Sequence, residues 1–203
     1  MAGQRKKPAL VLCSILFDAY RAGAASIGNY VIFAGGSRGT QWYTVEAFNT
    51  SLVKTTLTDL PAEGGPSMWA GASNSNYAIM AGGISAPTYA WNSSLTRTTL
   101  TNSLPNKEYA RNNAGTSHSK FAVFSGGYGL TPSTYYFLSS AQITYYDTSL
   151  VRYTDTLPTT ICQHCMETLG DSIIIFGGWV YPGTSGGWNS GEAQKKVYKY
   201  TIV

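Results

Sequence analysis

The sequence predicts an all-β domain that repeats one small antiparallel sheet four times. Four apolar runs end in a Gly-Gly pair, and these pairs recur every 44–51 residues, beginning at Gly35, Gly82, Gly126 and Gly177. A period in this range is typical of proteins in which each repeat is one structural unit that packs on the next. The composition agrees, with 22 glycines and 15 tyrosines among 203 residues and no long helical period bounded by capping residues. We therefore expect little or no helix.

The first two strands of each repeat lead into the Gly-Gly pair. Strand b is the apolar run itself, and a stretch of small residues before it forms strand a. The apolar runs cover 30–34, 77–81, 121–125 and 173–176. Because no helix signal follows the glycine pairs, we interpret them as bulges or sites of tight packing and not as nucleotide-binding loops.

Strand c and a turn follow in the first three repeats. A second apolar stretch covers 45–48, 88–91 and 143–146, and each is closed by Asn-Thr-Ser-Leu, Asn-Ser-Ser-Leu or Asp-Thr-Ser-Leu. An Asn or Asp before small hydroxyl residues favours a turn, because its side chain bonds the backbone two residues further on. One aromatic position of strand c recurs in all four repeats, and we assign it to packing between repeats: Phe48, Trp91, Tyr146 and Tyr200.

Strand d begins with a basic residue, runs through threonines and ends at Leu-Pro. The basic residues are Lys54, Arg97 and Arg152. Threonine favours strands and proline ends them. Four short antiparallel strands in the order a, b, c, d make one blade of a β-propeller, so the sequence predicts a small propeller of four blades. The predicted blades of this single domain, which spans 1–203, are 19–61, 62–105, 106–158 and 159–203.

The two ends of the chain are predicted to share the last blade. The fourth repeat stops after strand c, at residues 197–203, and residues 8–13 occupy the position of a strand d ahead of the first repeat. Pairing of these N- and C-terminal strands closes the ring and removes its open edge. The N-terminus also has the three-part form of a secretory signal, with basic residues 5–7, apolar residues 9–17 and small residues 22–24. We favour the strand, because the missing strand and the spare strand match.

The Gly-Gly pair and the strand after it resemble kelch repeats. Val45-Glu46-Ala47-Phe48-Asn49 and Ile143-Thr144-Tyr145-Tyr146-Asp147 are similar to the Val-Glu-x-Tyr-Asp pattern of that family, although strand d has threonine where kelch blades usually carry tryptophan. The repeats look more like the kelch-like arrays of bacterial and phage tail-module proteins than like animal kelch adaptors. The resemblance implies a propeller and leaves the function open, because kelch propellers include enzymes, adaptors and receptor-binding proteins.

Charge and cysteine content argue against several classes of function. The net charge is +4, and the only dense group of basic residues is 5–7, so the sequence lacks the basic stripe expected of a nucleic-acid-binding protein. It also lacks an apolar stretch of about 18 residues that could span a membrane. Two of the three cysteines lie in Cys162-Gln163-His164-Cys165, a spacing found in metal sites. A structural zinc site needs four ligands, and only Cys13 and His118 remain in the sequence to complete one. We expect small buried residues there, and neither a metal nor another cofactor.

Catalysis finds little support in the sequence. The chain holds two histidines and no Gly-x-Ser-x-Gly, P-loop or paired-carboxylate motif. His118 falls in a polar turn between strands a and b of the third repeat, where we expect an exposed side chain. We therefore expect that the protein is not an enzyme.

Candidate binding residues gather on one face of the predicted propeller. Because the strands alternate in direction, the b–c loops and the beginnings of strand a emerge together, opposite the a–b and c–d turns. The b–c loops differ in length and carry aromatic residues among glycines, which is where recognition is usually found. The loop candidates are Trp42, Tyr43, Tyr128, Trp179, Tyr181 and Trp188. The beginnings of strand a differ between blades and add Trp69, Arg111, Asn113 and His164.

The expected function is binding without catalysis. We expect a phage or bacterial-surface interaction module that recognises a glycan or a protein receptor, or that contacts neighbouring structural subunits. Its expected location is a virion or a cell surface, with a cytoplasmic stage before assembly. Two alternatives are a carbohydrate-active enzyme on a kelch scaffold and an intracellular protein-binding adaptor.

Overall fold

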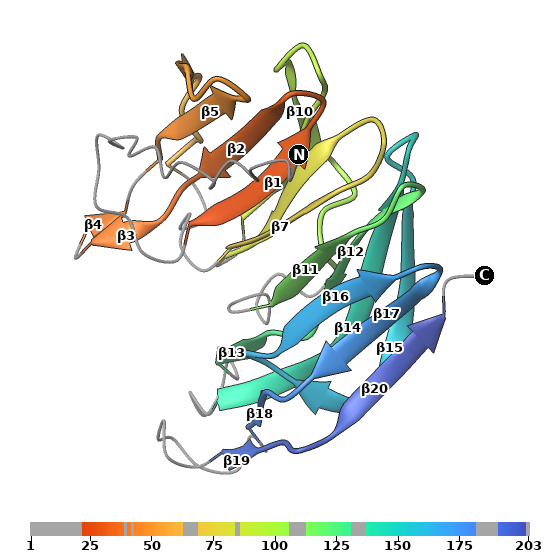
Figure 1. The fold of residues 1–203 in the computed structure, drawn as a ribbon. Helices are drawn as coiled ribbons and strands as arrows, with labels where there is room; N and C mark the ends of the chain where they lie inside the picture. The colour runs from red at the N-terminus through yellow and green to blue at the C-terminus, as the bar shows by residue number, and fades with distance from the viewer. Residues whose placement is uncertain are drawn as a thin grey trace, which may run out of the picture.

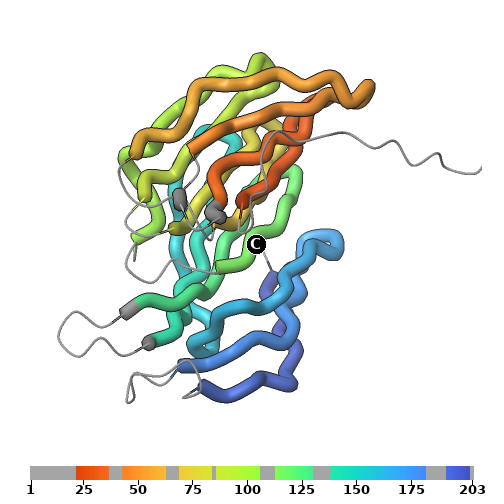
Figure 2. The backbone as a smooth tube through the Cα atoms, turned by 90° about the vertical axis from the view of Figure 1, so that its left-hand side faces the viewer, coloured from red at the N-terminus to blue at the C-terminus, as the bar shows by residue number. Residues whose placement is uncertain are grey.

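The protein is an all-β propeller with four blades (Figure 1). A computed structural model describes residues 22–38, 40–41, 43–62, 69–83, 86–105, 113–130, 137–181 and 191–201. Within these ranges every regular element is a strand and no helix occurs. Four antiparallel sheets follow one another in chain order, from red to blue in Figures 1 and 2.

The first two blades have the predicted strand order a, b, c, d. Blade one contains β1 (Gly23–Ile27), β2 (Tyr30–Ala34), β5 (Val45–Asn49) and β6 (Lys54–Leu57). Blade two contains β7 (Trp69–Ser73), β8 (Ala78–Gly82), β9 (Thr88–Trp91) and β10 (Arg97–Leu100). A short hairpin of β3 (Ser37–Arg38) and β4 (Thr40–Gln41) lies in the b–c connection of blade one.

The last two blades carry longer b–c connections. Blade three contains β11 (Ala114–Ser117), β12 (Phe121–Ser125), β14 (Phe137–Asp147) and β15 (Arg152–Ile161), with β13 (Tyr128–Leu130) paired to β14. Blade four contains β16 (Cys165–Leu169), β17 (Ser172–Phe176) and β20 (Val197–Thr201), and its b–c connection includes the pair β18 (Trp179–Val180) and β19 (Glu192–Ala193). The predicted strand at 8–13, and with it the closure of the ring, lies outside the described residues.

The strands a lie side by side at the centre of the propeller. β1 lies against β7, β7 against β11, and β11 against β16 (Figure 1). The backbones approach so closely that a Cβ at Gly71 would overlap the carbonyl of Ala24. Hydroxyl groups join neighbouring strands, since the backbone N–H of Ser73 donates to Ser117 Oγ over 2.8 Å. Small residues in strand a are therefore a packing requirement.

The hydrophobic core lies between blades. Ile32 of blade one packs in one cluster with Met80 and Trp91 of blade two. A second cluster joins Ile79 of blade two to Tyr146 of blade three. A third joins blades three and four and includes Tyr200 as a partly buried member. The predicted inter-blade role is thus confirmed for Trp91, Tyr146 and Tyr200, while Phe48 is buried and contacts Phe33 of its own blade edge-to-face.

The c–d turns are three copies of one hydrogen-bonded structure, as predicted. The Asn92 carboxamide oxygen accepts the backbone N–H groups of Ser94 and Thr96, each over 3.0 Å. Asn49 and Asp147 accept the equivalent pairs in blades one and three. The leucine that ends each turn has a positive φ, between 59° and 63°. The turn is therefore specified by its first side chain.

Replacing Asn92 tests this turn. We expect Asn92→Ala to lower the free energy of unfolding by about 1–2 kcal/mol, because two backbone N–H groups lose their acceptor. Asn92→Asp is the matched control, since blade three carries Asp147 at this position, and it should change stability little. Urea denaturation measures both, and equal losses in the two variants would contradict this account.

Replacing Trp91 tests the inter-blade core. We expect Trp91→Ala to cost about 3–5 kcal/mol of unfolding free energy, since it leaves a cavity between blades one and two. The exposed Val53 serves as the control, because Val53→Ala should stay within about 0.5 kcal/mol of the parent. A similar small effect of both substitutions would show that the layer between blades is not the core.

Candidate functional site

A small recess opens where blade two connects to blade three. Its cavity volume is about 20 Å³, which is room for one water-sized group. It lies where strands b end and strands a begin, on the face where the sequence predicts binding residues. The residues that line it are Leu104, Pro105, Asn113, Phe124, Ser125, Gly126, Ser140, Gln142 and Thr144.

Two buried polar atoms of the recess lack a hydrogen-bond partner. Asn113 stands directly before β11, and its Nδ2 donates to the Ala81 carbonyl over 3.4 Å. Its Oδ1 and the Thr144 Oγ1 of β14 are both buried and have no partner among the residues that the structure describes. A buried polar atom without a partner costs about 1–3 kcal/mol. A polar group from outside would therefore be stabilised in this recess.

Ser125 connects the recess to blade four. Its Oγ lies 2.8 Å from Nε2 of His164, the residue that precedes β16, and also donates to the Met166 sulfur over 3.1 Å. Asn113 and His164, both proposed from the sequence, thus both lie near Ser125: Asn113 lines the same recess, and His164 bonds the Ser125 hydroxyl. The Ser125–His164 pair is buried at the end of β12, in the layer between blades three and four.

Burial determines the charge of His164. Removal from solvent lowers the pKa of this imidazole to about 4, so the ring is neutral near pH 7. Its Nδ1 is buried and finds no partner in the described part of the chain. A serine–histidine pair acts as nucleophile and base when a third group orients the imidazole and the hydroxyl is reachable. Ser125 is only 2% exposed, and among the residues that the structure describes no carboxylate bonds His164 Nδ1.

The glycine pairs are structural, as predicted. All eight glycines of the four pairs have a positive φ. At Gly126, with φ +63°, a Cβ would lie 2.6 Å from His164 Cε1 and would overlap the Ile161 carbonyl. The chain passes this point only without a side chain, which lets β12 end against the beginning of blade four.

Three predicted binding aromatics from the long loops pack against one another. Tyr128 and Tyr181 are buried with Cys162, and Trp179 is half-buried against them. Backbone bonds hold this cluster together, since Cys162 and Trp179 exchange N–H···O bonds of 2.8–2.9 Å. The rings of Tyr128 and Tyr181 join the b–c connections of blades three and four, and of these three residues only Trp179 is partly exposed.

The other predicted residues fall in different environments. Trp69 is buried in the core between blades one and two and stacks on Tyr89, with ring centroids 5.6 Å apart. Tyr43 is half-buried, packs against the same core, and donates to the Ala62 carbonyl over 3.5 Å. Three predicted residues lie outside the described part of the chain: Trp42, Arg111 and Trp188.

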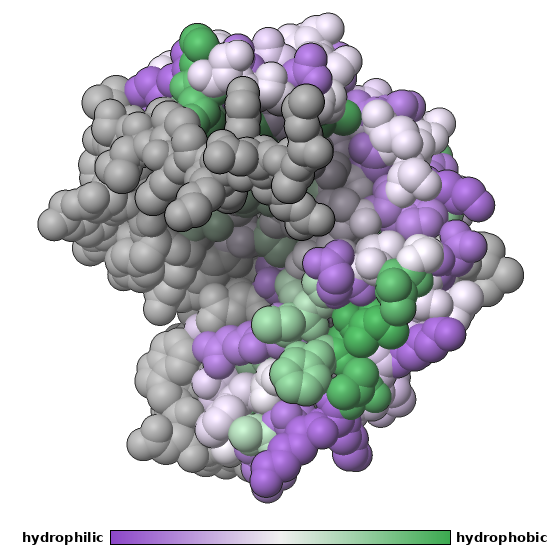
Figure 3. All heavy atoms as spheres, in the orientation of Figure 1, coloured by the Kyte–Doolittle hydropathy of each residue, from purple (hydrophilic) through white to green (hydrophobic). Residues whose placement is uncertain are grey.

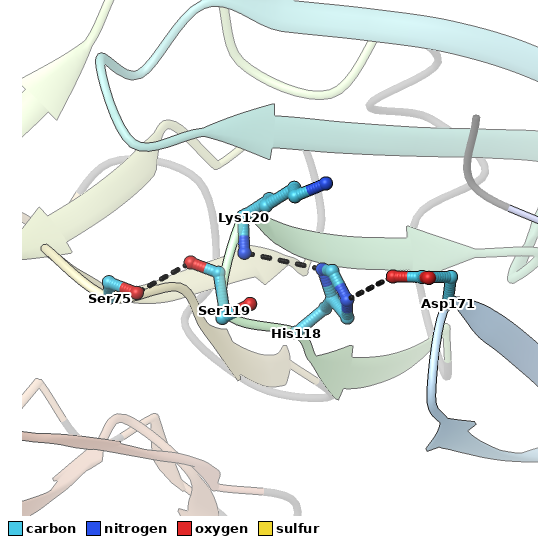
Figure 4. Close-up of polar contacts among 5 residues, drawn as sticks. All are labelled: Ser75, His118, Ser119, Lys120 and Asp171. Atoms are coloured by element: carbon cyan, nitrogen blue, oxygen red, sulfur yellow. Dashed lines mark hydrogen bonds and ion pairs between the residues drawn. The ribbon is translucent and has the colours of Figure 1, made fainter.

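The opposite face carries a second polar group, shown in Figure 4. His118 Nε2 lies 3.4 Å from Asp171 Oδ1, and His118 Nδ1 accepts the Lys120 backbone N–H over 3.2 Å. The exposure predicted for His118 is wrong, because its side chain is only 9% exposed. The a–b turns of blades three and four pack together there, and Ser75 bonds the Ser119 carbonyl of the neighbouring turn. The group joins three blades.

The cysteine pair with metal-like spacing does not converge. Cys162 is buried, where its thiol has a pKa raised to about 11 by desolvation, whereas Cys165 is exposed on β16. The described ranges contain no group of three or more His, Cys, Asp or Glu side chains placed to hold a metal ion. They also contain no helix long and apolar enough to span a membrane.

Sequence reasoning missed Ser125, Gln142 and Thr144. A signal for Ser125 was present, because the residue before the Gly-Gly pair is Ala34 in blade one and Ala81 in blade two. A hydroxyl at a position that carries a methyl group in blades one and two marks a local polar environment. Gln142 and Thr144 belong to a long strand whose two faces could not be assigned before its neighbours were known.

Comparison with known proteins does not assign the chain to a family. No protein-family model matches the chain, and no curated protein is similar to it. The class that is shown is therefore the fold, an all-β propeller of four blades.

The buried His164 predicts a pH dependence of stability. The folded pKa of about 4 lies below the unfolded value of 6.5, so the unfolded chain binds a proton first as the pH falls. The stability gained by keeping His164 neutral is complete above pH 6.5 and is lost between pH 6.5 and 4, at a cost of about 3 kcal/mol. Urea denaturation across this range should show the loss in the parent and a smaller one in His164→Gln. Parallel pH profiles would contradict burial of a neutral histidine.

Proposed function

We propose that this propeller is a non-catalytic binding module of a phage tail or bacterial surface and that it recognises a glycan. The observation that carries the proposal is the pair of unpartnered oxygens, Asn113 Oδ1 and Thr144 Oγ1, in one recess of water-like size. One sugar hydroxyl can donate to the Asn113 oxygen and accept from the Thr144 hydroxyl. The location on a virion or cell surface belongs to the proposal and is supported by the resemblance to tail-module kelch arrays.

The walls of the recess suit a carbohydrate. Leu104 and Phe124 line it beside the polar atoms, and sugar rings combine apolar C–H faces with hydroxyl groups. The volume admits one hydroxyl, so the rest of the glycan would lie across the face that carries the b–c connections. The half-buried Trp179 ring is a candidate contact on that face.

Binding is favoured over catalysis by the environment of Ser125. The carbohydrate-active alternative would use the Ser125–His164 pair, but the Ser125 hydroxyl already bonds His164 Nε2 and also contacts the Met166 sulfur. His164 has no carboxylate partner at Nδ1 in the described ranges. These two features support a structural role for the pair behind the recess.

A glycan array with the purified domain, followed by calorimetric titration of a hit, tests the proposal. We expect Asn113→Ala and Thr144→Val each to weaken binding about tenfold, which corresponds to the loss of one hydrogen bond of about 1.4 kcal/mol. Thr154→Val is the matched control, because Thr154 pairs with Thr144 across the sheet but is exposed. It should bind as the parent does.

The same variants separate binding from folding. Thr144→Val removes a buried hydroxyl without a partner, so its urea midpoint should equal or exceed that of the parent. Equal affinity of Thr144→Val and the parent would overturn the site. Binding of the labelled domain to host cells that persists after enzymatic removal of surface glycans would identify a protein receptor and overturn the glycan.

A further inference from the structure

A groove lies between the outer strands of blades one and two. Its cavity volume is about 450 Å³, and small-molecule sites typically have volumes of about 300–1,000 Å³. One wall is formed by residues 56–58 at the end of β6, and the other by residues 95–97 at the start of β10. Trp91 of β9 also lines the groove. The groove shares no lining residue with the recess between blades two and three.

The Arg97 side chain is held in place at this groove. Its Nη1 donates to the carbonyl of Thr58 over 3.1 Å and to the carbonyl of Asp59 over 2.8 Å. Its guanidinium carbon lies 5.4 Å from the ring centroid of Tyr89, which is a cation–π contact. These contacts join blade two to blade one, so the guanidinium is positioned without a ligand.

One edge of the Arg97 guanidinium remains available. The group carries N–H donors on Nε, Nη1 and Nη2, and the two carbonyls occupy Nη1 alone. No residue in the described ranges accepts a hydrogen bond from Nε or Nη2 of Arg97. An arginine edge with two N–H donors can bind both oxygens of one carboxylate through parallel hydrogen bonds.

The charge of Arg97 has no carboxylate partner among the described residues, where the ion pairs are Lys54–Glu46 and His118–Asp171. Blade one shows what the repeat provides at the same position. There Lys54 Nζ, the counterpart of Arg97, lies 3.0 Å from Glu46 Oε1. In blade two Tyr89 stands at the position of Glu46. The repeat has thus replaced the internal carboxylate by a ring and left the cation able to accept an external one.

The equivalent place between blades two and three is bridged by side chains. There Tyr146 Oη donates to the Asn102 carbonyl over 2.9 Å, and Asn102 Nδ2 donates to the Leu150 carbonyl over 3.0 Å. In the groove Trp91 stands at the position of Tyr146 and Asp59 at that of Asn102. Neither side-chain bridge forms among the described residues of blades one and two. This difference leaves the groove open to a ligand.

The walls of the groove combine apolar and hydroxyl groups. Leu57 and Leu95 line it together with Thr58 and Thr96. In Figure 3 the apolar side chains on the visible face gather over blade four, whereas polar and neutral side chains predominate at the top of the view, where β5 and β10 lie. A sugar ring matches such walls, because it carries hydroxyl groups around apolar C–H faces.

We propose that this groove binds an acidic sugar through its carboxylate. Nε–H and Nη2–H of Arg97 donate to the two carboxylate oxygens, while Thr58 and Thr96 supply hydroxyl groups for the sugar. The groove is a second site, on the outer side of blades one and two, and it does not rest on the glycan site proposed at the recess.

Titration with the trisaccharide of galacturonic acid tests the proposal. The NMR signal of the Arg97 Nε–H group, identified by its loss in Arg97→Lys, should shift on addition of the sugar. Calorimetry should show binding to the parent and a loss of about tenfold or more in Arg97→Lys, which keeps the charge but loses the two-donor edge. Because Lys54 occupies this position in blade one, the variant should fold.

Arg152→Lys is the matched control. Arg152 opens strand d of blade three and also bonds a carbonyl of the preceding blade, that of Ser103, but it does not line the groove. This variant should bind the trisaccharide as the parent does. The methyl ester of the trisaccharide, which lacks the negative charge, should bind the parent at least about tenfold more weakly.

Several results would overturn the proposal. These are an unchanged Arg97 signal at millimolar trisaccharide, equal affinity of Arg97→Lys and the parent, and equal affinity for the acid and its methyl ester. Tighter binding of a triglutamate peptide would identify an acidic peptide as the ligand and overturn the sugar. Asn113→Ala should retain binding, and its failure to bind the trisaccharide would place the ligand in the recess and overturn the second site.

Discussion

Packing of one sheet face on the next is the constraint on which this fold depends. Short strands in a small sheet cannot form an independent core, and the three main hydrophobic clusters lie between consecutive blades. Ile32, Ile79 and Val123 hold the same position before the Gly-Gly pair, and each packs in the cluster shared with the following blade. The repeat in the sequence is therefore a repeat of interfaces. On the corresponding face of blade four, Phe176 is exposed.

The two ends of the blades obey different rules. At the end that carries the c–d turns, one side chain accepts the same two backbone N–H groups in three blades, so this end varies little. At the other end the connections differ in length and content, and the recess forms there. Its key polar residues stand where the repeats diverge, such as Ser125 in place of the alanine found in blades one and two.

The buried polar groups of the recess lower the stability of the folded domain. Asn113 Oδ1 and Thr144 Oγ1 lose their hydration on burial without gaining a partner among the described residues. His164, kept neutral by burial, adds a penalty when the pH falls. Such costs are tolerated because the layers between blades are large and apolar. The scaffold and the recess therefore have separable energetics, because the scaffold depends on apolar burial and the recess contains buried polar groups.

The sequence by itself determined the number of blades, the order of their strands, the turn chemistry and the inter-blade aromatic position of Trp91 and Tyr146. These features follow from periodicity and from hydrogen bonds within a few residues, which a sequence displays directly. Tertiary structure decided exposure and proximity. Only packing shows that the rings of Trp69, Tyr128 and Tyr181 are buried, and that Asn113 and His164 both lie near Ser125. Burial and contact depend on distances between segments far apart in the chain, and these distances are set by how blades pack and not by any local pattern.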